Sequence, residues 1–128
     1  MNLIGRVKEK LKKYPRLNYE ETENSILVFP TSDDGFTVTL DVSYDDIKIF
    51  FNGWHEDFEI EDEALNCFAF GLSTDCRLKE FRRNGKSYQW TLEYKENGEW
   101  IADSTTSLFN FAFWQKKSIH YLQNDLIK

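Results

Sequence analysis

Apolar and polar residues alternate along most of this chain, as in β-strands that bury one face. In the clearest run, residues 36–43, the apolar positions are Phe36, Val38, Leu40 and Val42. Asn84-Gly85 is typical of a tight hairpin turn between two such runs. The strands predicted in this way cover residues 25–29, 36–43, 47–52, 77–83, 87–94, 99–103, 109–114 and 118–122.

Two segments have helical spacing instead. Residues 2–13 predict an amphipathic helix that ends before Pro15, because the residue before a proline avoids helical geometry. Residues 61–73 predict a second helix, which is apolar on nearly every side and is therefore expected at the centre of the core. Its main stripe consists of Leu65, Phe68, Ala69 and Leu72.

These elements predict an α+β fold in a single domain, residues 1–128. We expect a curved antiparallel sheet of about six strands, with the N-terminal helix and the central buried helix packed on it. A chain of 128 residues, 41% hydrophobic and 16% aromatic, has enough apolar surface for one core. The longest apolar run is too short to span a bilayer, so no membrane association is expected.

The net charge of −6 is unevenly distributed. Residues 18–63 carry fourteen acidic side chains and one basic one, whereas residues 64–94 carry three acidic and five basic ones. The acidic segment would repel phosphate backbones, so nucleic acid is not the expected partner. A protein with a basic surface is expected, and the simpler alternative is a solvated acidic surface.

Two cysteines, Cys67 and Cys76, do not form a disulfide framework in a chain of this length. With no secretory signal in the N-terminal residues, we expect a cytoplasmic protein with reduced thiols. Structural zinc sites pair ligands two to four residues apart, and the spacing of the two cysteines does not fit. The acidic segment could hold calcium or magnesium through oxygen ligands, but its SDDG cluster lacks the alternating Asp spacing of an EF-hand loop. We expect no metal and no cofactor.

The segment Trp54-His55-Glu56-Asp57 is the main candidate for chemistry. A histidine beside carboxylates can act as a general base, because negative charge raises its pKa. The structural alternative, which we favour, is a loop between a strand and a helix, with Trp54 in the core and the carboxylates in solvent.

A second group of candidates lies later in the chain. Arg77 belongs to a basic hairpin that could bind an anion or nucleic acid, although a solvated face is the simpler interpretation. Ser104, Thr105 and Thr106 predict a turn whose hydroxyl groups bind nearby backbone.

Several phrases of the sequence occur together: GWHEDF, ALNCFAFGLS, STTSLFNFAFW and IHYLQN. Over residues 50–124 the chain resembles a group of small bacterial proteins with a G-W-H-E-x-F phrase, for which we know no function. The matching polar residues would be the first to test as a site. They are His55, Glu56, Ser73, Arg77, Ser104, Thr105 and Thr106.

The leading hypothesis is a small acidic binding domain, not an enzyme, that engages a protein partner. A toxin-neutralising immunity protein is one concrete form of it. The alternative is a small enzyme or ligand-binding protein, with Trp54, His55 and Glu56 as one wall of a pocket and Arg77, Ser104 and Thr105 as another. In a third hypothesis the phrase around His55 only shapes the fold.

Overall fold

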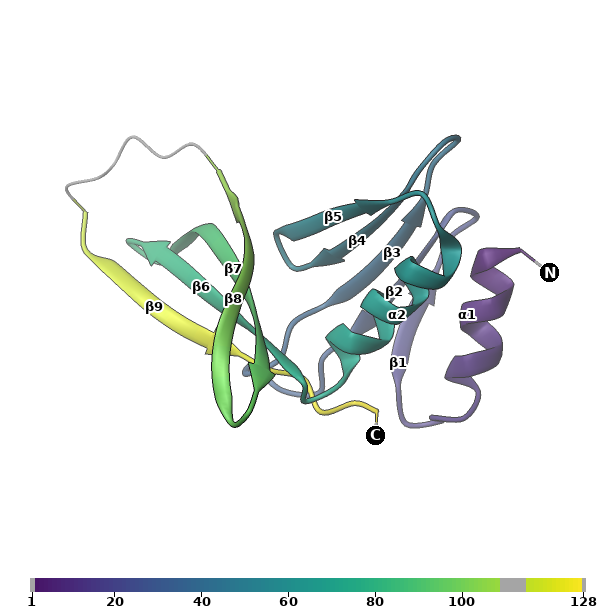
Figure 1. Ribbon diagram of the computed structural model, residues 1–128, viewed down its shortest axis with the longest axis horizontal. Coiled ribbons are helices and arrows are strands. Elements are labelled where there is room, and N and C mark those ends of the chain that lie inside the picture. The colour runs from purple at the N-terminus through teal and green to yellow at the C-terminus, as the bar shows by residue number, and fades with distance from the viewer. Residues whose placement is uncertain (1, 109–114, 128) are drawn as a thin grey trace.

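The computed structural model describes residues 2–108 and 115–127, which form two antiparallel sheets and two helices (Figure 1). Both helices pack against the first sheet, so the predicted α+β class is confirmed. The strands are divided between a five-stranded and a four-stranded sheet, whereas the sequence analysis expected a single one. No helix in these residues is long and apolar enough to cross a membrane.

The first sheet is a meander in which each strand pairs with the next along the chain. Its strands are β1 (Asn18–Glu21), β2 (Ser25–Phe29), β3 (Val38–Val42), β4 (Ile47–Phe51) and β5 (Trp54–Phe58). Every second side chain of β2, β3 and β4 is buried on the face that carries the helices, except that Val42 at the end of β3 is only partly buried. The alternation of apolar and polar residues in the sequence therefore reflects side chains that point in turn to the buried face and to the other face of the sheet.

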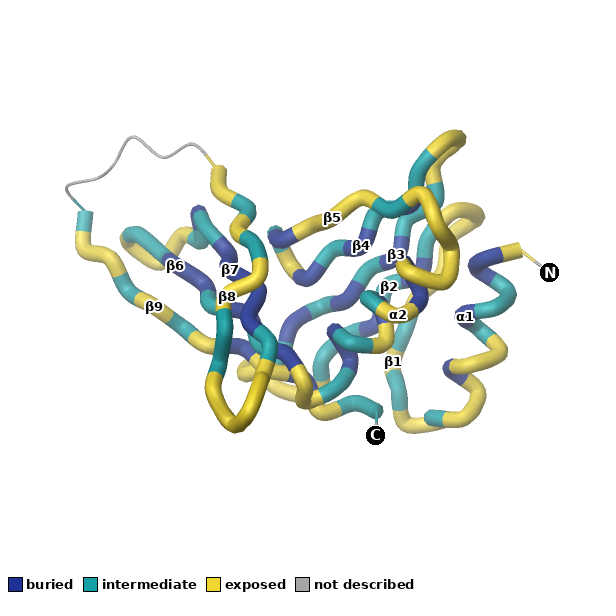
Figure 2. The backbone as a smooth tube through the Cα atoms, viewed as in Figure 1, coloured by how far each residue is buried: buried dark blue, intermediate teal, exposed yellow. Residues whose placement is uncertain are grey.

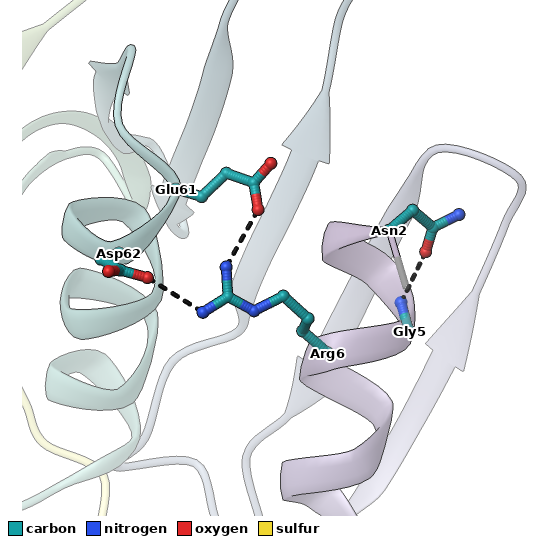
Figure 3. Close-up of polar contacts among 5 residues, drawn as sticks. All are labelled: Asn2, Gly5, Arg6, Glu61 and Asp62. Atoms are coloured by element: carbon teal, nitrogen blue, oxygen red, sulfur yellow. Dashed lines mark hydrogen bonds and ion pairs between the residues drawn. The ribbon is translucent and has the colours of Figure 1, made fainter.

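Two helices cover this buried face, α1 (Leu3–Leu11) and α2 (Glu61–Leu72). The Asn2 side chain caps α1 by accepting a hydrogen bond of 2.8 Å from the Gly5 amide. The Arg6 guanidinium of α1 reaches Glu61 at 3.0 Å and Asp62 at 2.9 Å in the first turn of α2 (Figure 3). Part of the acidic segment therefore sits where a helix N-terminus favours negative charge.

The second sheet has the order β8-β7-β6-β9. Its strands are β6 (Cys76–Arg83), β7 (Lys86–Glu96), β8 (Glu99–Ser107) and β9 (Lys117–Leu122). One face bears Leu78, Trp90 and Leu92, which join the same core as the first sheet. Buried positions concentrate along β2–β4, β6 and β7, whereas β5 and β9 are mostly exposed (Figure 2).

The largest difference from the sequence-based expectation is that Trp54–Phe58 is a strand and not a loop. Asn52-Gly53, interpreted from the sequence as the end of a strand, is the two-residue turn of a hairpin in which Phe51 pairs with Trp54. Asn52 has a φ of 51°, as such turns require. The strand predicted over residues 109–114 lies outside the described residues.

The side chain of Asn124 joins parts of the chain that are far apart in sequence. Its amide group donates to the carbonyls of Phe36, at 3.0 Å, and Gly71, at 2.9 Å, and its carbonyl oxygen accepts from the Phe36 amide at 3.0 Å. Asn124 is only 3% exposed, so these backbone groups have little access to water. The segment after β9 is thereby tied to the start of β3 and the end of α2.

We expect Asn124→Ala to lower the free energy of unfolding by about 2–4 kcal/mol, because it leaves buried backbone groups of Phe36 and Gly71 without partners. Urea denaturation followed by circular dichroism measures the change. The neighbouring substitution Asp125→Ala removes an exposed side chain and should cost less than about 0.5 kcal/mol. Equal losses from both variants would contradict a special role for the Asn124 amide.

Candidate functional site

The predicted site residues on β5 divide between the two faces of the strand. Trp54, Glu56 and Phe58 pair with Phe51, Ile49 and Ile47 of β4, and therefore share their face. His55 lies on the opposite face, opposite Phe50. Glu56 and the imidazole of His55 consequently point away from each other, so the strand does not assemble the acid–base pair that the sequence suggested.

Trp54 anchors β5 to the second sheet. Its ring is 1% exposed and stacks on Phe51 with centroids 4.8 Å apart. The indole N–H donates to the hydroxyl of Ser104 on β8 at 3.0 Å. Ser104 therefore supplies the hydrogen-bond acceptor that a buried tryptophan requires.

His55 is attached to the same strand through its backbone. Its amide donates to the hydroxyl of Thr106 at 3.3 Å. The imidazole ring is exposed and lies with its centroid 5.5 Å from that of Phe50. The backbone amide of His55, and not its imidazole ring, therefore attaches this part of β5 to β8.

Two of the predicted residues lie on the other face of the second sheet. Thr105 points away from Ser104 and Thr106, and its hydroxyl lies 2.8 Å from that of Thr91. Arg77 binds the Glu93 carboxylate at 2.6 Å. Five predicted residues therefore gather where β5 meets β8, and Arg77 and Thr105 do not. Ser73, implied by the resemblance, ends α2 by donating to the Phe70 carbonyl at 2.8 Å.

A pocket of about 340 Å³ opens beside Trp54, between α2, β5 and the β7–β8 pair. Its apolar walls include Phe58, Phe70, Leu92 and Tyr94. Glu56 and Asp103 also line it. Within residues 2–108 and 115–127, neither of these carboxylates forms an ion pair.

The electrostatics of this pocket favour a positive charge. Glu56 is exposed overall, but partial desolvation of its carboxyl raises the pKa above its ordinary value, and the negative charges of Asp103 and Asp57 raise it further. A cation placed between Glu56 and Asp103 would relieve this repulsion and lower the pKa again. The pocket therefore combines an apolar lining with an unneutralised negative charge.

Cys67 of α2 also lines the pocket but is a poor nucleophile. Burial raises the pKa of its thiol to about 12, and the pKa of Cys76 is likewise raised to about 12. Because the thiolate is the reactive form, both thiols are essentially inert at neutral pH. Both are free cysteines.

Asp103, Phe58, Phe70 and Tyr94 were not among the predicted site residues. Asp103 lies at a register shift, where Leu92 pairs with Ser104 but Glu93 pairs with Ala102. Such a bulge changes the direction of the extra side chain, and the pattern of apolar and polar residues in the sequence does not predict it. The three aromatic residues were identifiable from the sequence only as core residues.

Comparisons with protein-family models, curated proteins and solved structures found no match to this chain. The resemblance to the group with the G-W-H-E-x-F phrase therefore stays a prediction from the sequence.

We expect Ser104→Ala to destabilise the fold by about 1–3 kcal/mol, because it leaves the buried indole N–H of Trp54 without an acceptor. His55→Ala, which removes an exposed ring, should change stability by less than about 0.5 kcal/mol. Chemical denaturation of the two variants side by side measures both effects. A larger loss from His55→Ala would show that the ring, and not the amide, supports the strand.

The raised pKa values predict that neither thiol of the folded protein reacts with Ellman's reagent near neutral pH, whereas both react once guanidinium unfolds the chain. Reactivity of the native protein should increase as the pH rises towards about 12. Cys67→Ser assigns any slow native reaction to one thiol or the other. Rapid labelling of Cys67 at neutral pH would contradict the buried, protonated state.

Proposed function

We propose that this chain is a protein-interaction domain whose acidic surface binds a protein partner that has a basic surface. The surface concerned, termed here the acidic face, surrounds Phe58. It consists of Asp45, Asp46, Glu56, Asp57, Glu59 and Asp103. The observation that carries the proposal is the pocket beside Phe58, which joins apolar walls to the carboxylates of Glu56 and Asp103; no lysine or arginine is among its described lining residues.

The pocket fits a long basic side chain better than a simple ion. The stem of a lysine or arginine would lie along the apolar walls formed by Phe58, Phe70 and Leu92, and its charge would reach Glu56 and Asp103. A hollow on the other side of Phe58 is lined by Asp45, Asp46, Asp57 and Glu59. Phe58 would then be a central apolar contact within a charged rim, as interfaces commonly have.

In the acidic face only Asp57 has a cation nearby, Lys48 at 3.7 Å, among the residues that the structure describes. The uncompensated charge would attract a basic partner over a distance comparable to the Debye length and accelerate encounter. An immunity protein that neutralises a basic toxin is one concrete form of this function. Small size, acidity and abundant aromatic residues support that form.

A small cationic ligand is the second candidate. The pocket volume of about 340 Å³ lies at the lower end of the range for small-molecule sites. Glu56 would hold an ammonium group, while Trp54 and Tyr94 would line the rest of the site. His55 takes no part in this pocket, so ligand binding has more support than acid–base catalysis.

The test is affinity purification from the native host, with mass spectrometry of the captured proteins. We expect a stoichiometric protein with a basic surface. The double variant Glu56→Gln/Asp103→Asn should weaken its binding at least about tenfold, because the buried charge of the partner loses both carboxylates. The matched variant Glu20→Gln/Glu23→Gln removes two exposed carboxylates, one on β1 and one in the turn that follows it, and should retain the partner.

Binding of that partner should also weaken as the pH falls. Because the pKa of Glu56 is raised, its carboxylate is protonated at a higher pH than an ordinary glutamate. Titration calorimetry at several pH values should show this loss in the wild type and not in Glu56→Gln. Repeated purifications without a stoichiometric protein, together with saturable binding of a simple alkylamine, would favour the small-ligand alternative.

A further inference from the structure

The face of the four-stranded sheet that points away from Trp54 carries a concentration of positive charge, and is termed here the basic face. Cross-strand register defines its members. The cations at these positions are Arg77, Lys79, Arg83, Lys86, Lys95 and Lys117, and Glu93 is the one carboxylate among them. Arg77 pairs with Glu93 at 2.6 Å, whereas Lys79, Lys86, Lys95 and Lys117 form no ion pair with any residue that the structure describes.

Aromatic rings lie between these cations. The Arg77 guanidinium sits 4.5 Å from the ring centroid of Trp100 on β8 and 4.2 Å from that of Tyr121 on β9. The Lys79 ammonium lies 5.3 Å from Phe81 and 6.0 Å from Tyr121. These cation–π contacts hold the aromatic rings beside the positive charges.

Part of this aromatic and apolar surface is open to solvent. Tyr121 is 49% exposed and Ile119, its neighbour on the same face of β9, is 44% exposed. Lys117, 4.8 Å from the Phe81 ring, is also exposed. A ligand can therefore reach a ring and a cation at the same time.

The acidic segment, residues 18–63, was the reason not to expect nucleic acid as a partner. It does not lie on the basic face. Residues 18–63 form the five-stranded sheet and the start of α2, whereas the basic face belongs to β6, β7, β8 and β9 (Figure 1). The two charged regions are thus on different sheets. Net charge describes the chain as a whole and does not describe this face.

We propose that the basic face binds single-stranded nucleic acid. Single strands offer both features that this face matches, namely a repeated negative charge for Lys79, Lys95 and Lys117 and flat bases that can stack on Tyr121. An acidic protein segment would satisfy the charges but not the exposed ring. The proposal is independent of the acidic face, which lies around Phe58.

The test uses fluorescence anisotropy with labelled oligothymidine of about 15 nucleotides, a length suited to a single-strand site. We expect saturable binding that Lys79→Glu/Lys117→Glu weakens at least tenfold. Loss of two phosphate contacts should also reduce the slope of log affinity against log salt by about 1.4. Tyr121→Leu, which keeps apolar bulk but removes the flat ring, should weaken binding about fivefold or more.

The matched control is Lys10→Glu/Lys13→Glu, which makes the same charge change at exposed positions near α1. It should bind oligothymidine within about twofold of the wild type. Circular dichroism checks that every variant remains folded. Three results would overturn the proposal: no binding at low salt, an equal loss in the control, or effective competition by a polyglutamate peptide with no effect of Tyr121→Leu. The last result would assign the face to an acidic protein.

Discussion

The side-chain amide of Asn124 satisfies the backbone of two elements that would otherwise end without partners. It binds Phe36 just before β3 and Gly71 near the end of α2. The following residues add to the attachment, because the amide of Leu126 donates to the carbonyl of Leu72. The first sheet, its covering helix and the segment after the second sheet are therefore held by one buried network, in which an unpaired group would be costly.

The second constraint is the close approach of the two sheets. A Cβ atom at Gly53 would lie 2.3 Å from the Trp90 ring, so the turn between β4 and β5 can meet β7 only as glycine. This contact brings β5 beside β8, and the hydrogen bond from Trp54 to Ser104 fixes it. The pocket and the acidic face follow from this junction, since Asp103 comes from one sheet and Glu56 from the other.

Local patterns in the sequence predicted both helices and most strands, because an element that buries one face has apolar residues at regular intervals along the chain. They did not predict β1 and β5, the two edge strands of the first sheet, whose residues are mostly exposed. The candidate site was found only in part. Adjacent residues of a strand point to opposite faces, so Ser104 and Thr106 reach β5 while Thr105 does not. The contact between β5 and β8 and the bulge at Asp103 depend on tertiary structure, so the local pattern of residues could not predict them.

The separation of charge between the sheets gives this molecule an electric dipole as well as a net charge of −6. A dipole exerts a torque on an approaching charged body and turns the protein before contact occurs. Partners of opposite sign would be met by different surfaces of the same chain, with no competition for a shared surface. Both encounters would slow as salt is added, because the field that orients the protein is screened beyond about a nanometre.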